Sequence, residues 1–334
     1  KPGILPLIIF IAVLAIVLAF IGYNVYAIAF PQLATQQNTS AAVQKPVLLL
    51  ADNCPNCIPL QAVAQQVLTD FETVSASTDK GRELVETYSI SKLPALIVYS
   101  EASLSVPLVA SEFEQRAGAL VFEAPSPPFI DVKTGELKGS VDVIVITPIN
   151  CSQCTSAESV LNELKSSNVL LVEQRLQEDS VEAKSLIAKY DISFLPTFIF
   201  SPVLLQYPSF NRSWSILGSV ETDGSLVMRQ PVPPFKNLSN NNSVDGLVLV
   251  TYLTDDACQT CYNVSIHRRA LLGYGVFIAN ESFVDVASLE GQAFVEKYNL
   301  TKVPTVVLSK EAGAYPALKQ LWESVGSIER GDVF

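Results

Sequence analysis

The hydrophobic positions of the chain form one long uninterrupted run and a series of short ones. The long run covers residues 4–30 and contains no charged residue. As a helix rising about 1.5 Å per residue, it would be about 40 Å long, more than the roughly 30 Å of a bilayer core. Residues 1–30 are therefore predicted to form one long hydrophobic α-helix, as a membrane anchor or as a filament core. Residues 31–45 lack hydrophobic periodicity and are predicted to be a linker.

The short apolar runs recur at a domain-sized period. The runs at residues 46–50, 141–146 and 247–252 each have the length of a buried strand. After the first two runs, apolar residues continue at helical spacing, at Leu60, Val63, Val67 and Leu68, and at Val160, Leu161 and Leu164. The pattern predicts repeated units in which a strand is followed by a helix.

The six cysteines follow the predicted strands in pairs of one spacing, CxxC. The first cysteines of successive pairs are 97 and 107 residues apart. A proline that opens a further apolar run lies 40, 45 and 46 residues after the first cysteine of each pair. The pairs and their prolines are Cys54 and Cys57 with Pro94, Cys151 and Cys154 with Pro196, and Cys258 and Cys261 with Pro304.

This combination of strand, CxxC pair, helix and proline-led strand resembles the thioredoxin fold, and its repetition resembles the protein disulfide isomerases. The resemblance implies an α/β protein of three tandem thioredoxin-like domains, each with a central mixed sheet flanked by helices. The domains are expected at residues 46–124, 129–230 and 244–334. The implied disulfides are Cys54–Cys57, Cys151–Cys154 and Cys258–Cys261, and the implied cis-prolines of the substrate groove are Pro94, Pro196 and Pro304.

The resemblance also implies a redox chemistry. A first cysteine at a helix N-terminus would lie at the positive end of the helix dipole, which lowers the pKa of its thiol. Cys54, Cys151 and Cys258 would then be the attacking thiolates. Cys57, Cys154 and Cys261 would resolve the mixed disulfides. No cofactor other than these redox disulfides is implied.

Other positions favour permanent structural disulfides. Redox-active thioredoxins usually carry a buried acid six residues before the first cysteine. This chain has Leu48, Val145 and Tyr252 at those positions. The tryptophan usual just before the pair is replaced by Asn53, Asn150 and Ala257. Three inert disulfides in an oxidising compartment are therefore the alternative to a redox role.

A metal site is not expected. Two CxxC pairs could form a four-thiolate zinc site only if they met in space, and each pair lies in its own predicted domain. The single histidine, His267, lies beyond the third pair next to Arg268 and Arg269 and is expected at the surface.

Proline-rich segments separate the predicted domains. Residues 124–128 and 230–234 each contain three prolines, which disfavour a helix and predict short extended spacers. Residues 131–136 and 221–224 have the composition of hairpin turns.

Charge and glycosylation motifs indicate the compartment. With 33 acidic against 22 basic residues and a net charge of -11, the chain lacks the basic clusters that nucleic-acid binding needs. Sequons for N-linked glycans begin at Asn38, Asn150, Asn211, Asn237, Asn241, Asn263, Asn280 and Asn299. Their number predicts an extracellular glycoprotein. Because Asn150, Asn263 and Asn299 lie close to the second and third sites, the first domain is the favoured catalytic one.

The start of the chain resembles a second family. Residues 3–14 look like the N-terminal helix of archaeal type IV pilins and archaellins. Lys1, in place of methionine, fits either a leader removed by a prepilin-type peptidase or a truncated chain. The resemblance implies a subunit of a glycosylated cell-surface filament, whose helices self-associate in the core while the thioredoxin-like domains form the outer sheath.

Two further functions stay open. The chain is alternatively a membrane-anchored extracytoplasmic thiol-disulfide oxidoreductase or isomerase with cysteine-containing protein substrates. It is otherwise an anchored subunit of a larger surface complex that uses its domains only for binding. The cysteines distinguish the first two hypotheses, because a filament needs inert disulfides and an enzyme needs at least one pair that cycles.

Overall fold

The computed structural model describes residues 44–52, 54–99 and 113–328. The predicted hydrophobic helix at 1–30, most of the linker at 31–45 and the sequon at Asn38 lie outside the described residues. Within the described part, no helix is both long enough and apolar enough to cross a membrane. The described residues form a mixed α/β fold with eight α-helices and several sheets, consistent with thioredoxin-like domains.

The first sheet has the strand order β2-β1-β4-β6-β5. Its first two strands are parallel and the others join antiparallel. The elements are β1 (Val47–Leu50), α2 (Leu60–Val67), β2 (Glu72–Ser75), α3 (Asp79–Thr87), β4 (Ala95–Val98), β5 (Glu114–Arg116) and β6 (Ala119–Glu123). The parallel pair requires a crossover, which the helix α2 supplies.

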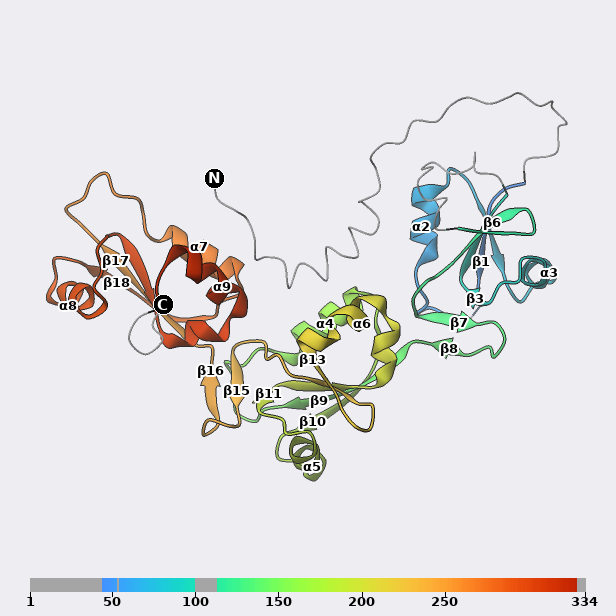
Figure 1. The fold of residues 1–334 in the computed structure, drawn as a ribbon. Coiled ribbons are helices and arrows are strands. Elements are labelled where there is room, and N and C mark those ends of the chain that lie inside the picture. Colours follow the sequence, from blue (N-terminus) through green and yellow to red (C-terminus); the bar gives the residue numbers. More distant parts are fainter. Residues whose placement is uncertain (1–43, 53, 100–112, 329–334) are drawn as a thin grey trace.

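The second sheet repeats this topology in the order β10-β9-β12-β14-β13. Its elements are β9 (Ser140–Thr147), α4 (Ala157–Ser166), β10 (Leu170–Gln177), α5 (Val181–Lys189), β12 (Thr197–Phe200), the 3-10 helix η3 (Pro202–Gln206), α6 (Pro208–Leu217), β13 (Gly218–Val220) and β14 (Leu226–Met228). Figure 1 shows α4 and α6 on one face of this sheet and α5 on the other. The turn at 221–224 joins β13 to β14, with Glu221 N donating to Ser225 O.

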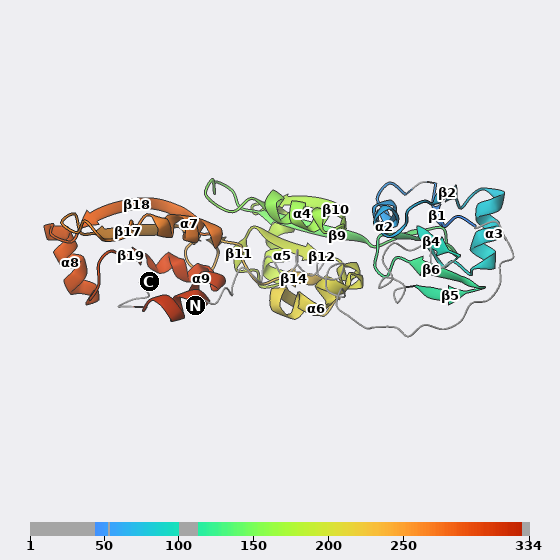
Figure 2. The same cartoon turned by 90° about the horizontal axis from the view of Figure 1, so that it is seen from above.

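The third sheet has the order β18-β17-β19 among the described residues. Its elements are β17 (Val248–Thr254), α7 (Ile266–Gly273), β18 (Ile278–Asp285), α8 (Leu289–Tyr298), β19 (Thr305–Leu308), the 3-10 helix η4 (Lys310–Ala314) and α9 (Pro316–Val325). Figure 2 shows the three sheets following one another along the molecule in chain order. We call the parts built on these sheets the first, second and third units.

Apolar side chains cover both faces of the central strands, because helices pack on both sides. In β1, Leu48 packs with α2 while Leu49 packs on the opposite face beside α3. In β9, Val145 faces α4 and Ile146 faces α5. This two-sided burial explains why these strands appear in the sequence as continuous apolar runs.

Serine and threonine caps set the starts of the second helix in each unit. Thr78 Oγ1 accepts from Gly81 N, Ser180 Oγ from Ala183 N, and Ser288 Oγ from Gly291 N. Each cap satisfies a backbone donor that the helix leaves open. The repeated cap places the three helices in the same way after their parallel strands.

Each proline-rich segment leads into a β-hairpin. The first hairpin consists of β7 (Phe129–Asp131) and β8 (Leu137–Lys138), and it pairs with β3 (Lys92–Leu93) of the first unit. The second consists of β15 (Phe235–Asn237) and β16 (Ser243–Asp245), and it pairs with β11 (Phe194–Leu195) of the second unit. Each hairpin therefore folds back on the unit that precedes it, although residues 129–138 lie inside the predicted second domain. The predicted domain boundaries stay a prediction.

Candidate redox sites at the CxxC disulfides

All six cysteines form disulfides within their own CxxC pairs, Cys54–Cys57, Cys151–Cys154 and Cys258–Cys261. Each pair follows the carboxyl end of a central strand, β1, β9 or β17. All six cysteines are half-buried. Among the described residues, no cluster of histidine, cysteine and carboxylate side chains could hold a metal ion.

A cis-proline segment faces the first disulfide. The Sγ of Cys57 lies 3.7 Å from the carbonyl oxygen of Leu93, and the peptide bond between Leu93 and Pro94 is cis. The bonds before Pro196 and Pro304 are also cis. The structure thus brings the cysteine and proline of the first unit together, although they are far apart in the sequence. The catalytic roles of the cysteines remain a prediction.

The helix that follows each CxxC pair begins several residues after the first cysteine. The expected redox chemistry requires that cysteine to lie at the helix N-terminus. The helices α2, α4 and α7 begin at Leu60, Ala157 and Ile266, which are six, six and eight residues after the first cysteine of their pair. In the first unit Pro59 explains the delay, because the residue before a proline avoids the helical region. The influence of a helix dipole fades within the first turn. The expectation that each first sulfur lies at a helix N-terminus is therefore wrong.

The position six residues before each first cysteine holds a fully buried apolar or aromatic side chain. Leu48, Val145 and Tyr252 are each 0% exposed. The hydroxyl of Tyr252 donates to Glu281 Oε1 at 2.8 Å, and Arg268 Nε donates to Glu281 Oε2 at 2.9 Å. Burial, followed by the hydrogen bond to Glu281, raises the pKa of Tyr252. The hydrogen bond from Arg268 holds the pKa of Glu281 below its usual value. Sequence reasoning missed Glu281, because nothing in its local pattern distinguishes it from a surface acid.

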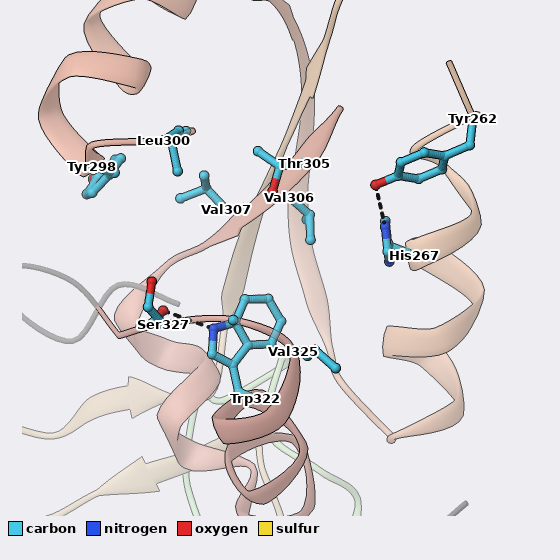
Figure 3. A pocket seen from close by; sticks show the side chains of 11 residues that line it. Tyr262, His267, Tyr298, Leu300, Thr305, Val306, Val307, Trp322, Val325 and Ser327 are labelled. Atoms are coloured by element: carbon cyan, nitrogen blue, oxygen red, sulfur yellow. Dashed lines mark hydrogen bonds between the residues drawn. The ribbon is translucent and has the colours of Figure 1, made fainter. Parts of the chain in front are cut away.

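A hollow of about 250 Å³ opens in the third unit (Figure 3). His267 lines it and is half-buried, and its Nε2 lies 3.1 Å from the hydroxyl of Tyr262. That hydroxyl donates to Pro304 O at 3.1 Å. The hollow lies between β19 and residues 326–327, and in the second unit β14 fills the corresponding space between β12 and β13. It provides no argument for a ligand.

An ion pair holds the segment before the first cis-proline. Glu123 Oε1 accepts from Ser91 N at 2.6 Å and from Arg116 Nη1 at 3.1 Å, and Glu123 Oε2 accepts from Ser91 Oγ at 2.8 Å. The side chain of Glu123 is only 10% exposed. Burial raises the pKa of Glu123, but the hydrogen bonds from Arg116 and Ser91 outweigh it, and the pKa is below its usual value.

We expect Glu123→Gln to lower the free energy of unfolding by about 1–3 kcal/mol at pH 7, since an amide group would face Arg116 in place of the carboxylate. A folded-state pKa below the unfolded one makes the ionised carboxylate stabilising above about pH 4.5. The difference between wild type and variant should therefore shrink as the pH falls below that value. Urea unfolding at pH 7 and at acidic pH measures it.

The matched control is Glu114→Gln. Glu114 pairs with the same guanidinium, but its side chain is 73% exposed, and exposed pairs contribute little. Equal losses in both variants, or a loss for Glu123→Gln that does not change with pH, would contradict this account.

The seven described sequon asparagines differ in accessibility. Six of them are exposed, namely Asn150, Asn211, Asn241, Asn263, Asn280 and Asn299. Asn237 is half-buried, and its Nδ2 donates to Asp245 Oδ2 at 2.7 Å. A glycan on Asn237 would have to disrupt this bond, which joins the two strands of the second hairpin. Glycosylation itself remains a prediction.

No family model and no curated protein matches the chain. Solved structures that are similar include the alkylhydroperoxide reductase protein AhpF from Enterococcus faecalis, at 14% identity and a TM-score of 0.17, with 51% of this chain and 82% of that chain covered. Human ERp44 is similar at 11% identity and a TM-score of 0.15, with 79% and 76% covered. ERdj5 is similar at 14% identity and a TM-score of 0.15, with 80% of this chain and 37% of that chain covered. Similarities this low carry no argument about activity.

Proposed function

We propose that the chain is a thiol-disulfide oxidoreductase or isomerase that works through its CxxC disulfides. The observation that carries the proposal is the approach of Cys57 Sγ to the carbonyl of Leu93, the residue before cis-Pro94, at 3.7 Å. It places a half-buried CxxC disulfide directly against the backbone of the cis-proline segment. The same order of strand, disulfide and cis-proline occurs in all three units.

The short loop that each disulfide closes also supports exchange over a purely structural role. In the chain-entropy model, closing a loop of about four residues stabilises a protein by only about 2 kcal/mol. A disulfide kept for stability alone would contribute more if it joined distant segments, because the entropy of loop closure grows with loop length. None of the six cysteines joins distant segments.

The proposed location follows from the sequence. We place the chain outside the cell, attached by residues 1–30 to a membrane or to a surface filament, with N-linked glycans on exposed sequons. Its partners would be thiol or disulfide compounds and, at the anchor, lipid or further copies of the chain. Nucleic acid is no partner of so acidic a protein.

The second candidate is a subunit of a pilus-like filament with inert disulfides. The observation that favours it is the gap between each first cysteine and the helix that follows, together with the buried Leu48, Val145 and Tyr252 where an acid would assist proton transfer. The cysteines therefore lack both a helix N-terminus and an acid at the position six residues before the first cysteine, two features that increase the reactivity of a thiolate.

A glutathione redox buffer distinguishes the two candidates. The native chain is equilibrated at pH 7 over a range of glutathione ratios, the free thiols are alkylated, and the peptides carrying each pair are weighed by mass spectrometry. If the chain is an oxidoreductase, at least one pair should move reversibly between dithiol and disulfide while the circular dichroism stays native. If all three pairs stay oxidised until the protein unfolds, the oxidoreductase is excluded and the disulfides are structural.

A further inference from the structure

The first hairpin occupies the position beside the first disulfide that an extended substrate strand would need. Ile58, the residue after Cys57, donates its N–H to Pro128 O at 2.9 Å. Beside cis-Pro94, Leu93 in β3 pairs with Ile130 in β7. The linker thus contacts the chain just after the CxxC pair and just before the cis-proline.

The second linker makes the same two contacts in the second unit. Thr155, the residue after Cys154, donates its N–H to Pro234 O at 2.6 Å. Leu195, the residue before cis-Pro196, pairs with Lys236 in β15. An ion pair adds to this contact, since Lys236 Nζ lies 2.6 Å from Glu178 Oε1 and both side chains are 15% exposed.

A side chain of the second linker reinforces its contact with the second unit, and one close approach recurs within both linkers. Phe235 is 9% exposed, and its ring packs edge-on against Phe194 with centroids 5.8 Å apart. At the end of the second hairpin, Gly246 has φ of +92°, and a Cβ on it would lie 2.7 Å from Pro233 Cβ. Gly139 ends the first hairpin in the same way, with φ of +93° and a Cβ position 2.1 Å from Pro127 Cβ. Because Pro127 and Pro233 belong to the linkers themselves, these close approaches show that the two linkers share one internal conformation.

A linker hairpin bound beside the cis-proline competes strongly with a substrate strand for that position. A polypeptide that adds a strand beside a cis-proline uses main-chain hydrogen bonds, and the hairpins already use those groups. The linker is also part of the same chain, so its effective concentration reaches the millimolar range or more. The cysteine residues are only half-buried, and a small thiol needs no strand position to react with them.

We propose that Cys54–Cys57 and Cys151–Cys154 exchange with small thiols and are closed to extended polypeptide thiols, because the linker hairpins occupy the strand position at each cis-proline. This inference rests on the proposed redox function and names its substrate class. A small thiolate attacks one sulfur, the S–S bond breaks, and the released cysteine thiolate takes up a proton. A second small thiol then attacks the mixed disulfide, so that two thiols are oxidised to one small disulfide and the protein pair is reduced to two thiols.

The test compares two reductants on the full chain. Reduced glutathione and reduced, unfolded ribonuclease A are applied at equal thiol concentration, and the reduction rate of each pair is measured by alkylation and mass spectrometry. A synthetic disulfide peptide covering residues 149–156 provides the intrinsic ratio of the two rates. For the first two pairs we expect the polypeptide-to-glutathione ratio to be at least about tenfold below that of the peptide, given the effective concentration of a tethered linker.

A variant with a loosened hairpin provides the second measurement. Phe235→Ala combined with Lys236→Ala removes the contacts to Phe194 and Glu178. It should raise the polypeptide rate at Cys151–Cys154 by about tenfold, the factor that the tethered linker would impose. The rate at Cys54–Cys57 should not change. Asn240→Ala, on an exposed position of the same hairpin, is the control and should change neither rate.

The outcomes separate the inference from the proposed function. A wild-type ratio equal to that of the peptide overturns the inference and leaves the redox function standing. If glutathione reduces no pair of the native protein, the redox function fails and the inference fails with it. If glutathione reduces the pairs but the loosened variant reacts with the polypeptide no faster than the wild type, the redox function stands and the inference is overturned. If that variant does not fold, the polypeptide-to-glutathione rate ratio of the wild type, compared with that of the peptide, alone decides whether the inference stands.

Discussion

Replacing Trp214 by alanine is expected to lower the free energy of unfolding of the second unit by about 3–5 kcal/mol, the range found for large aromatic residues removed from a core. Trp214 lies in α6 and is 5% exposed. Its ring meets Phe200 edge-on at 5.9 Å, and its Nε1 donates to Ser219 O at 3.1 Å. The variant would lose this packing and leave a cavity over β12.

Urea unfolding followed by hydrogen exchange measures this effect, because peptides from β9 report on the second unit and peptides from β1 on the first. The control is Ile216→Ala in the same helix. Ile216 is 64% exposed, and its removal should change stability by no more than about 0.5 kcal/mol. If the two variants behaved alike, α6 would not contribute to the core as described.

Gly81→Ala is expected to destabilise the first unit by about 1–3 kcal/mol, as overpacking of a core does. An added Cβ would lie 2.0 Å from the carbonyl oxygen of Ser75, so the backbone between β2 and α3 would have to move. Gly291 has the same close contact, at 2.1 Å from Asp285 O. The second unit has Ala183 at the corresponding position, fully buried, so the close approach is a property of the first and third units.

Gly273→Ala is the matched control for this prediction. Gly273 ends α7, and no atom lies within 4 Å of the position of its added Cβ. Alanine there should stabilise the helix by up to about 1 kcal/mol, because it is the better helix former. Thermal unfolding of both variants provides the comparison. If Gly81→Ala were more stable than the wild type, the backbone carbonyl of Ser75 would be able to move away with little loss of free energy.

Much of the fold was predictable from local pattern. The apolar runs at 46–50, 141–146 and 247–252 overlap the central strands of the three sheets, because a strand buried on both faces needs apolar side chains at successive positions. The hairpin turns at 131–136 and 221–224 were predictable from their glycine and polar residues. These features depend on neighbours in the chain, so composition and spacing suffice to predict them.

The details of the sites were less predictable. A CxxC pair followed by a helical pattern indicated a helix that begins at the pair, but Pro59 and the cap at Ser156 set later starts. The ion pairs Glu123–Arg116, Glu178–Lys236 and Glu281–Arg268 join residues that are distant in the sequence or on separate elements, and no single-sequence pattern marks them. The proline-rich segments indicated spacers, whereas the structure docks each of them on the unit before it.

The sequence by itself determined that the chain has a long hydrophobic segment followed by three repeats, each with a strand, a CxxC pair and a proline. Periodicity and spacing are properties of the chain alone. Only the tertiary structure decided what surrounds each disulfide. Main-chain hydrogen bonds from Ile58 to Pro128 and from Thr155 to Pro234 carry no side-chain signature, so the sequence could not show that the linkers lie beside these disulfides. Access to a disulfide depends on what packs beside it, which is determined by contacts between segments far apart in the chain.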